Sequence, residues 1–212
     1  MINYYSIQNK IINTLEINKS KFKTYLFPIA SIEDFQTQYE TIKKDHSKAN
    51  HHCSAYIFGL NQHHQKANDD GEPSGTAGYP MLEVLKQNDL TNIGTVVVRY
   101  FGGIKLGSGG LIRAYSSSVS EALHEAQITA NVIQEIYSLM LPYQNNDIFQ
   151  YFIDQTAINV QILDTQYTDK IEYTLGLFKE DIDPFFKEVN QRLNGNFQHI
   201  FVKEQAIDIP KF

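Results

Sequence analysis

Tryptophan is absent from this chain of 212 residues, and cysteine occurs once, at Cys53. A lone cysteine has no partner within the chain, so the class of small secreted proteins held together by internal disulfides is excluded. The first residues, MINYYSIQNK, lack the apolar run of a signal peptide. No apolar stretch approaches the roughly 20 residues that a membrane-spanning helix needs. We therefore expect a cytoplasmic protein with no membrane partner.

Low-complexity tracts, internal repeats and linkers rich in glycine, proline or serine are also missing. The hydrophobic content of 42% and the charged content of 20% are ordinary for folded domains. The net charge of -6 is uneven, because residues 1–127 carry 12 charges of each sign whereas residues 128–212 carry 6 basic and 12 acidic residues. This asymmetry predicts two units with different surfaces, and it argues against a C-terminal unit that binds phosphate backbones through bulk charge.

The most informative stretch runs from Thr91 to His124. It begins with a β-branched run around Val97 that is typical of a strand buried on both faces. Five glycines then occur within nine residues, between Gly102 and Gly110, and helical spacing of apolar residues follows from Leu111. The pattern predicts a strand, a glycine-rich loop and a helix in direct succession. The N-terminal end of such a helix favours anions, since its free N–H groups and its dipole point outward.

The segment before this stretch predicts two strands, 11–17 and 20–29, joined by a turn at Asn18 and Lys19. Because strand side chains alternate, Lys21 and Lys23 fall on one side and form either a positive stripe or a plain solvated face. A helix is expected to start after Ser31 and to end before residue 49, and a strand is expected over 51–60.

A second loop, Asn68–Gly78, contains the three carboxylates Asp69, Asp70 and Glu72 and a run of small residues. A short helix follows, and Ser74 or Thr76 is the expected cap. The carboxylates would serve as an acid and base pair or as ligands of a hard cation. Alternatively, they form an acidic turn whose charge favours the helix N-terminus.

The C-terminal part predicts a strand, a helix, two strands, a helix and a strand over 131–204. This βαββαβ order is that of a ferredoxin-like sandwich. We therefore predict an α+β protein with two domains, 1–127 and 128–212.

The sequence departs from the familiar nucleotide-binding and catalytic motifs at specific positions. Ser108 stands where a P-loop needs lysine, Ile112 stands where a dinucleotide fingerprint needs its third glycine, and the nucleophile-elbow spacing is absent. Adjacent histidines, such as His51 and His52, point to opposite faces of a strand, so we expect no metal site. Neither a cofactor nor a catalytic residue is assigned.

The two loops together resemble those of the IMPACT family, in its bacterial, YigZ-like branch. The matching segments are Lys19–Phe22, Asp70–Gly78 and Val97–Gly107, followed by Leu111, Ile112, Ala114 and Tyr115. The resemblance implies a first domain with a left-handed βαβ two-layer sandwich like domain IV of elongation factor G, a ribosomal-protein-like fold. It implies a second domain like domain V of that factor. Eukaryotic relatives regulate translation, and only that association carries over to this chain.

Three functional hypotheses follow. The first is a non-enzymatic translation regulator that binds RNA, the ribosome or a translation-associated protein through the glycine-rich loop. The second is an enzyme acting on a phosphorylated or peptide-like small molecule in the same cleft, and the third makes both loops purely structural. The expected binding residues are Lys21, Lys23, Arg99, Gly102, Gly103, Lys105, Gly107, Ser108, Gly109, Gly110 and Arg113. The second loop would contribute Asp70, Glu72, Ser74, Gly75, Thr76 and Gly78.

Overall fold

A computed structural model describes residues 2–211, which divide into two compact units. One unit comprises residues 3–131 and 209–211, and the other comprises residue 2 and residues 132–208. Both contain an antiparallel sheet with helices packed on it, which confirms the predicted α+β class with two sheets. The division at residue 127 stays a prediction.

The first unit is built on a five-stranded antiparallel sheet in the order β2-β3-β6-β4-β5. Its strands are β2 (Ile11–Ile17), β3 (Ser20–Pro28), β4 (His51–Phe58), β5 (His64–Asn68) and β6 (Ile93–Tyr100). The turn between β2 and β3 has positive φ at both Asn18 and Lys19, as a tight two-residue hairpin requires. The predicted hairpin is therefore confirmed.

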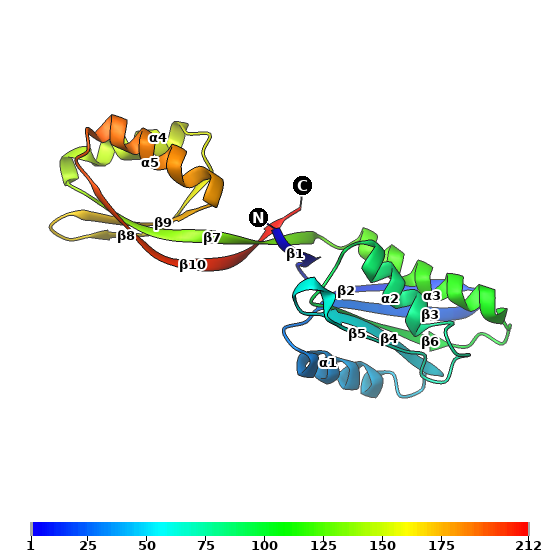
Figure 1. Cartoon of the computed structure of the whole chain (residues 1–212). Coiled ribbons are helices and arrows are strands. Elements are labelled where there is room, and N and C mark those ends of the chain that lie inside the picture. The colour runs from blue at the N-terminus through cyan, green and yellow to red at the C-terminus, as the bar shows by residue number, and fades with distance from the viewer. Residues whose placement is uncertain (1, 212) are drawn as a thin grey trace. The chain divides into compact units, whose positions relative to one another are not determined.

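Helices cover both faces of this sheet, as Figure 1 shows. On one face lie α2 (Gly78–Gln87) and α3 (Gly107–His124), and on the other lies α1 (Ile32–Asp45). The predicted two-layer sandwich corresponds to the sheet with α2 and α3, while α1 adds a layer beneath it. Ser31 caps α1 by accepting a hydrogen bond from the backbone N–H of Asp34 at 3.0 Å, as predicted.

Strand β6 lies at the centre of the sheet, and this explains its continuous apolar run. Val96 and Val98 pack with α1 on one face, whereas Val97 packs with α2 and α3 on the other. By the same alternation, Arg99 faces the α2 and α3 side. A charged side chain is thus placed at the end of a buried strand, directly before the glycine-rich loop.

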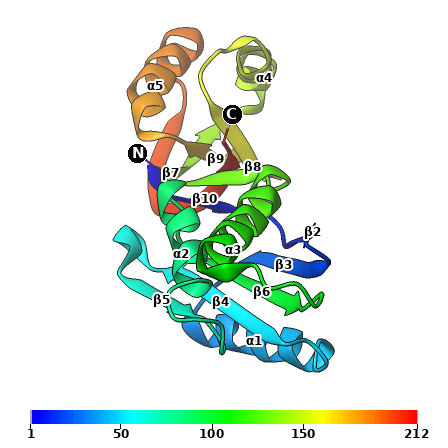
Figure 2. The same ribbon diagram turned by 90° about the vertical axis from the view of Figure 1, so that its right-hand side faces the viewer.

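The second unit has the predicted βαββαβ order, and Figures 1 and 2 show both of its helices on one side of its sheet. Its elements are β7 (Ile128–Leu141), α4 (Asn146–Gln155), β8 (Val160–Tyr167), β9 (Ile171–Leu177), α5 (Lys179–Leu193) and β10 (Gln198–Pro210). The strand order β10-β7-β9-β8 is that of a ferredoxin-like fold.

Several elements differ from the sequence-based expectation. Strand β1 (Ile2–Ile7), which pairs with β7, and strand β5 were not expected. Short 3₁₀ helices occur at Leu60–Gln62 and Tyr143–Asn145. The expected cap of α2 by Ser74 or Thr76 is wrong, because neither hydroxyl bonds to the helix start; the acceptor is Asp69.

Candidate functional site

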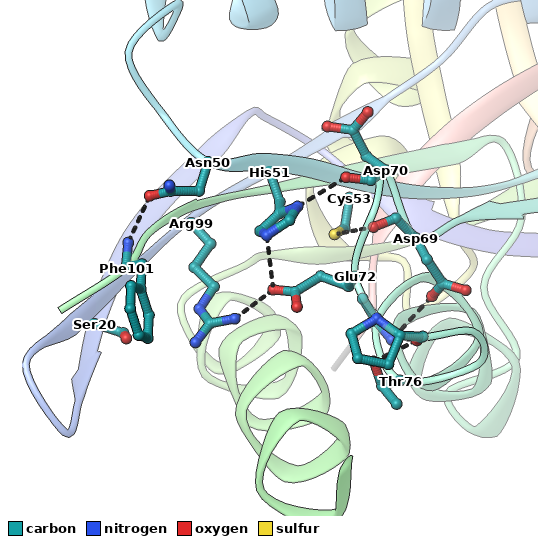
Figure 3. A network of polar contacts seen from close by, with 12 residues as sticks. Ser20, Asn50, His51, Cys53, Asp69, Asp70, Glu72, Thr76, Arg99 and Phe101 are labelled. Carbon is teal, nitrogen blue, oxygen red and sulfur yellow. Dashed lines mark hydrogen bonds and ion pairs between the residues drawn. The ribbon is translucent and has the colours of Figure 1, made fainter. Parts of the chain in front are cut away.

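The two loops lie against each other around a cavity of about 450 Å³. Glu72 and Pro73 line it from the second loop, Arg99 from β6, and Phe101, Lys105 and Ser108 from the glycine-rich segment. The predicted proximity of the two motifs is therefore confirmed. Figure 3 shows His51, Glu72 and Arg99 turned toward one another at this place.

Arg99 forms the floor of the cavity and is only 5% exposed. Its Nη1 donates to Oε1 of Glu72 at 2.6 Å. The guanidinium also lies 5.3 Å from the ring centre of Phe22 and 5.4 Å from that of Phe101. Since a buried charge needs a partner and aromatic faces attract guanidinium groups, these contacts account for the burial of Arg99.

Glu72 is the acceptor on which a buried chain of hydrogen bonds converges. Tyr115 donates its hydroxyl proton to the same Oε1 at 2.8 Å. The thiol of Cys53 has two acceptors within reach of its one proton, the carbonyl oxygen of Asp69 at 3.0 Å and the Tyr115 oxygen at 3.3 Å. Burial raises the pKa values of both Cys53 and Tyr115 above their usual ranges, so both groups keep their protons at neutral pH. The network therefore supports the floor of the cavity, and the Cys53 thiol within it is not a reactive thiolate.

His51 lies beside the floor of the cavity, and a hydrogen bond fixes the role of one of its ring nitrogens as donor. Its Nδ1 lies 2.8 Å from the carbonyl oxygen of Asp70, so Nδ1 must be the donor. Its Nε2 lies 3.9 Å from Oε1 of Glu72, and the side chain lines the cavity. In the neutral ring, Nε2 is thus the nitrogen able to accept a proton on the cavity side.

Asp69 and Asp70 hold the second loop in place and do not line the cavity. The carboxylate of Asp69 accepts from the backbone N–H groups of Gly75, Ala77 and Gly78 at 2.8–3.0 Å, which caps α2. The carboxylate of Asp70 accepts from the backbone N–H of His52 at 2.6 Å. The interpretation as an acidic turn that favours the helix start therefore fits Asp69.

Four small residues of the second loop were predicted as site members, namely Ser74, Gly75, Thr76 and Gly78. The hydroxyl of Thr76 donates to the carbonyl of Pro73 at 2.6 Å, and Ser74 is exposed. A Cβ at Gly78 would collide with the backbone of Asn68, and Gly75 has φ +76°. These contacts favour a packing role for Thr76 and Gly78. Gly75 has open space around it and serves the turn through its positive φ, and Ser74 is an exposed residue of the loop.

The glycine-rich segment contains two kinds of glycine. A Cβ at Gly102 would overlap the carbonyl carbon of Lys19, so this glycine allows the loop to pass the β2–β3 turn. Gly103 and Gly107 instead have φ of +87° and +69° with open space around them. Gly107, Ser108, Gly109 and Gly110 form the first turn of α3, whose N-cap residue Leu106 makes no side-chain cap. The helix thus begins with exposed backbone N–H groups beside the cavity.

The predicted cationic side chains are divided among three places. Lys105 lines the cavity beside Arg99. Arg113 lines a separate hollow with Asn18 and Ser117, although its guanidinium lies against the first turn of α3 at Gly109. Lys21 and Lys23 share the α1 face of β3 with Tyr25, and Lys23 Nζ lies 5.4 Å from that ring. The structure therefore does not bring Lys21 and Lys23 together with the residues that line the cavity, and their predicted part in binding stays a prediction.

Six residues that line the cavity were not predicted from the sequence as site members, namely Asn50, His51, Pro73, Phe101, Leu106 and Leu111. Strand alternation places His51 on the same side as Cys53 and Ala55, and this was the available signal. Tyr115, which fitted the apolar stripe of a helix, is also the donor that orders Glu72.

Residues 2–211 contain no group of three or more His, Cys, Asp or Glu side chains arranged to hold a metal ion. None of the helices within those residues is long and apolar enough to cross a membrane.

Two family models match the chain. The Impact N-terminal domain matches residues 18–123, and a domain of unknown function (DUF1949) matches residues 141–196. A solved structure described as a hypothetical protein is 29% identical, covers 96% of this chain and 98% of its own, and superposes with a TM-score of 0.60. The structure of the two-domain translational regulator Yih1 is 25% identical and covers 59% of this chain and 48% of its own, but its TM-score of 0.36 is too low to indicate a shared overall fold.

Bacterial relatives match almost the whole chain. The IMPACT family member YvyE of Bacillus subtilis is 38% identical over 91% of this chain and 88% of its own length. The IMPACT family member YigZ of Escherichia coli is 31% identical over 89% of this chain and 93% of its own length. With these identities and this coverage, the chain belongs to the IMPACT family.

Proposed function

We propose that the protein is a cytoplasmic regulator of translation that binds RNA, as a free strand or on the ribosome, through the start of α3. The α3-start surface consists of Lys105, Gly107, Ser108, Gly109 and Arg113, all exposed. Two side-chain cations thus flank a helix end that has no side-chain cap. That combination, which attracts phosphate groups through charge and through N–H donors, is the observation that carries the proposal.

The proposed site is confined to the first domain, for which we keep the limits 1–127. The second domain, 128–212, has the acidic excess described above, so its contribution would come from shape and not from bulk charge. Arg99 supports the binding surface from below because its charge is already paired with Glu72. Loss of its charge would therefore disturb the fold, so Arg99→Ala is a poor probe of RNA contact.

A fluorescence-anisotropy titration with a single-stranded RNA tests this function. Lys105→Ala and Arg113→Ala should each weaken binding and lower the slope of log affinity against log salt by about 0.7, the value for one phosphate contact on a single strand. Lys21→Ala removes an equal charge from the opposite face and should change neither quantity. Unmeasurable binding at low salt, or equal losses in all three variants, would exclude the proposed surface.

A second candidate function is an enzyme that acts on a phosphorylated or peptide-like small molecule in the cavity. One observation favours it: the Asp70 carbonyl fixes Nδ1 of His51 and leaves Nε2 to accept a proton on the cavity side. Release of phosphate from phosphate monoesters, or of amines from dipeptides, would have to be lost in His51→Gln. Ligand binding without turnover would exclude this candidate.

A further inference from the structure

We infer that the cavity between the two loops binds the terminal phosphate monoester of a nucleotide, with the phosphate near the start of α3 and the base against Phe101. This inference rests on the proposed function, since it specifies which part of an RNA the surface takes. The same chemical group is present on a free mononucleotide, and the two sources are separated by the experiment below.

The first observation is an unused donor in the cavity floor. Nε of Arg99 is buried without a hydrogen-bond partner, although Nη1 of the same group is bonded to Glu72. A buried donor without a partner is costly and calls for an explanation, such as a ligand whose binding reorders the side chains around it. Because Arg99 lines the cavity, an anion arriving there would meet this guanidinium.

The second observation is independent of Arg99. Helix α3 is 18 residues long, and its first turn presents Gly107 and Ser108 to the same cavity without a side-chain cap. Backbone N–H groups of a first turn have no partner within the helix. The helix end and the guanidinium therefore converge on one space from two different elements.

The charges that face the cavity favour an anion. Arg99 and Glu72 offset each other at 2.6 Å, and Lys105 adds a positive charge that has no ion-pair partner within residues 2–211. Nε2 of His51 also lies at the cavity, and Glu72 is the negative group that it faces at 3.9 Å. A phosphate monoester matches this balance better than a neutral or cationic ligand does.

Shape and size extend the inference from phosphate to nucleotide. A volume of about 450 Å³ lies within the range of small-molecule sites and far exceeds the need of an inorganic anion. Phe101 is 44% exposed beside the cavity, so part of its ring is open for a base to stack on. The buried side chains of Arg99, Glu72 and Leu111 close the floor, and a chain could not continue through it. A terminal phosphate, which has one ester substituent, fits a closed floor better than a phosphodiester, which needs space for the chain on both sides.

Two matched pairs of probes test this inference on the full chain: AMP against adenosine, and a single-stranded RNA with a 5′-phosphate against the same RNA with a 5′-hydroxyl. We expect the phosphorylated member of at least one pair to bind about tenfold more tightly, as one charge-assisted contact would give. Lys105→Ala should remove most of that preference, and Lys21→Ala should leave it unchanged.

Arg99→Lys supplies a second variant, because lysine keeps the charge beside Glu72 but has no counterpart of Nε. It should lower the preference while its melting temperature, measured alongside, reports whether the fold is retained. Equal affinity within both pairs in the wild-type protein overturns the inference. RNA that binds with no preference for the 5′-phosphate, together with equal affinity for AMP and adenosine, retains the proposed function and rejects the inference. AMP that binds more tightly than adenosine to a protein that binds no RNA retains the inference and rejects the proposed function.

Discussion

Arg99 and Glu72, 27 residues apart in the chain, form an ion pair in which both side chains are at least 94% buried. The pair ties the second loop to the end of the central strand β6, and so it fixes the shape of the cavity between the two motifs. Replacement of either residue by a neutral one would leave the buried charge of the other without a partner.

Glu72→Ala should therefore lower the free energy of unfolding by about 3–5 kcal/mol, the cost of breaking a buried pair. Urea denaturation followed by circular dichroism measures this loss. Glu83→Ala is the matched control, because Glu83 pairs with Lys86 on an exposed surface, and its midpoint should stay at the wild-type value. Similar losses in the two variants would contradict the importance assigned to the buried pair.

Asp69→Ala should destabilise the protein by about 1–2 kcal/mol, because the start of α2 loses its only side-chain acceptor in the described residues. Asp69→Asn retains an acceptor oxygen and should lose less. Ser74→Ala, at a position that the sequence favoured as the cap, should have no effect on the unfolding midpoint. If Ser74→Ala lowered the stability as much as Asp69→Ala does, the cap would be Ser74 and not Asp69.

The two neighbouring glycines Gly102 and Gly103 should respond differently to alanine. Gly103→Ala introduces positive φ at an alanine in open space and should cost about 1 kcal/mol. Gly102→Ala forces a Cβ onto the backbone of Lys19 and should cost at least about 2 kcal/mol. Thermal unfolding of both variants is the measurement, and the reverse order of stability would show that the loop does not pass the β2–β3 turn as described.

Stability should also fall as the pH rises, through Cys53. Burial raises the pKa of this thiol in the folded protein, whereas in the unfolded chain it titrates near its ordinary value of about 8.5. Above that pH the unfolded state releases a proton that the folded state keeps, so the stability contributed by the thiol decreases by about 1.4 kcal/mol per pH unit. Denaturation at several pH values between 7 and 10 tests this effect, and Cys53→Ala should show a shallower decline. Identical slopes in the two proteins would mean that the thiol is not shielded.

The sequence was most informative where local patterns and burial agree. Alternation predicted β3, the Ser31 cap predicted the start of α1, and the valine run predicted β6 because that strand is covered on both faces. Strand β5, with the sequence HQKAN, is exposed along its whole length at the edge of the sheet. It therefore lacks the apolar alternation by which a strand is recognised.

The site was predictable in part for a similar reason. Both loops could be found from their composition, but the partner of each charged residue depends on strand register, which brings His51 opposite Arg99 on neighbouring strands. No local pattern in the sequence shows that register. Nor does one show that Arg99 forms an ion pair with Glu72, whereas Lys105 lines the cavity without such a pair in the described residues. The division of the cations between two faces of the sheet likewise follows from the fold and not from their spacing.

Co-sedimentation with purified ribosomes from a bacterium that contains an IMPACT family protein tests the central claim most directly. The wild-type protein should pellet with ribosomes at low salt, and the double variant Lys105→Ala and Arg113→Ala should remain in the supernatant. The double variant Lys21→Ala and Lys23→Ala, which loses the same charge from the α1 face, should pellet like the wild type. Two double variants that behave alike would contradict binding through the start of α3, and wild-type protein that stays in the supernatant would exclude the ribosome as its partner.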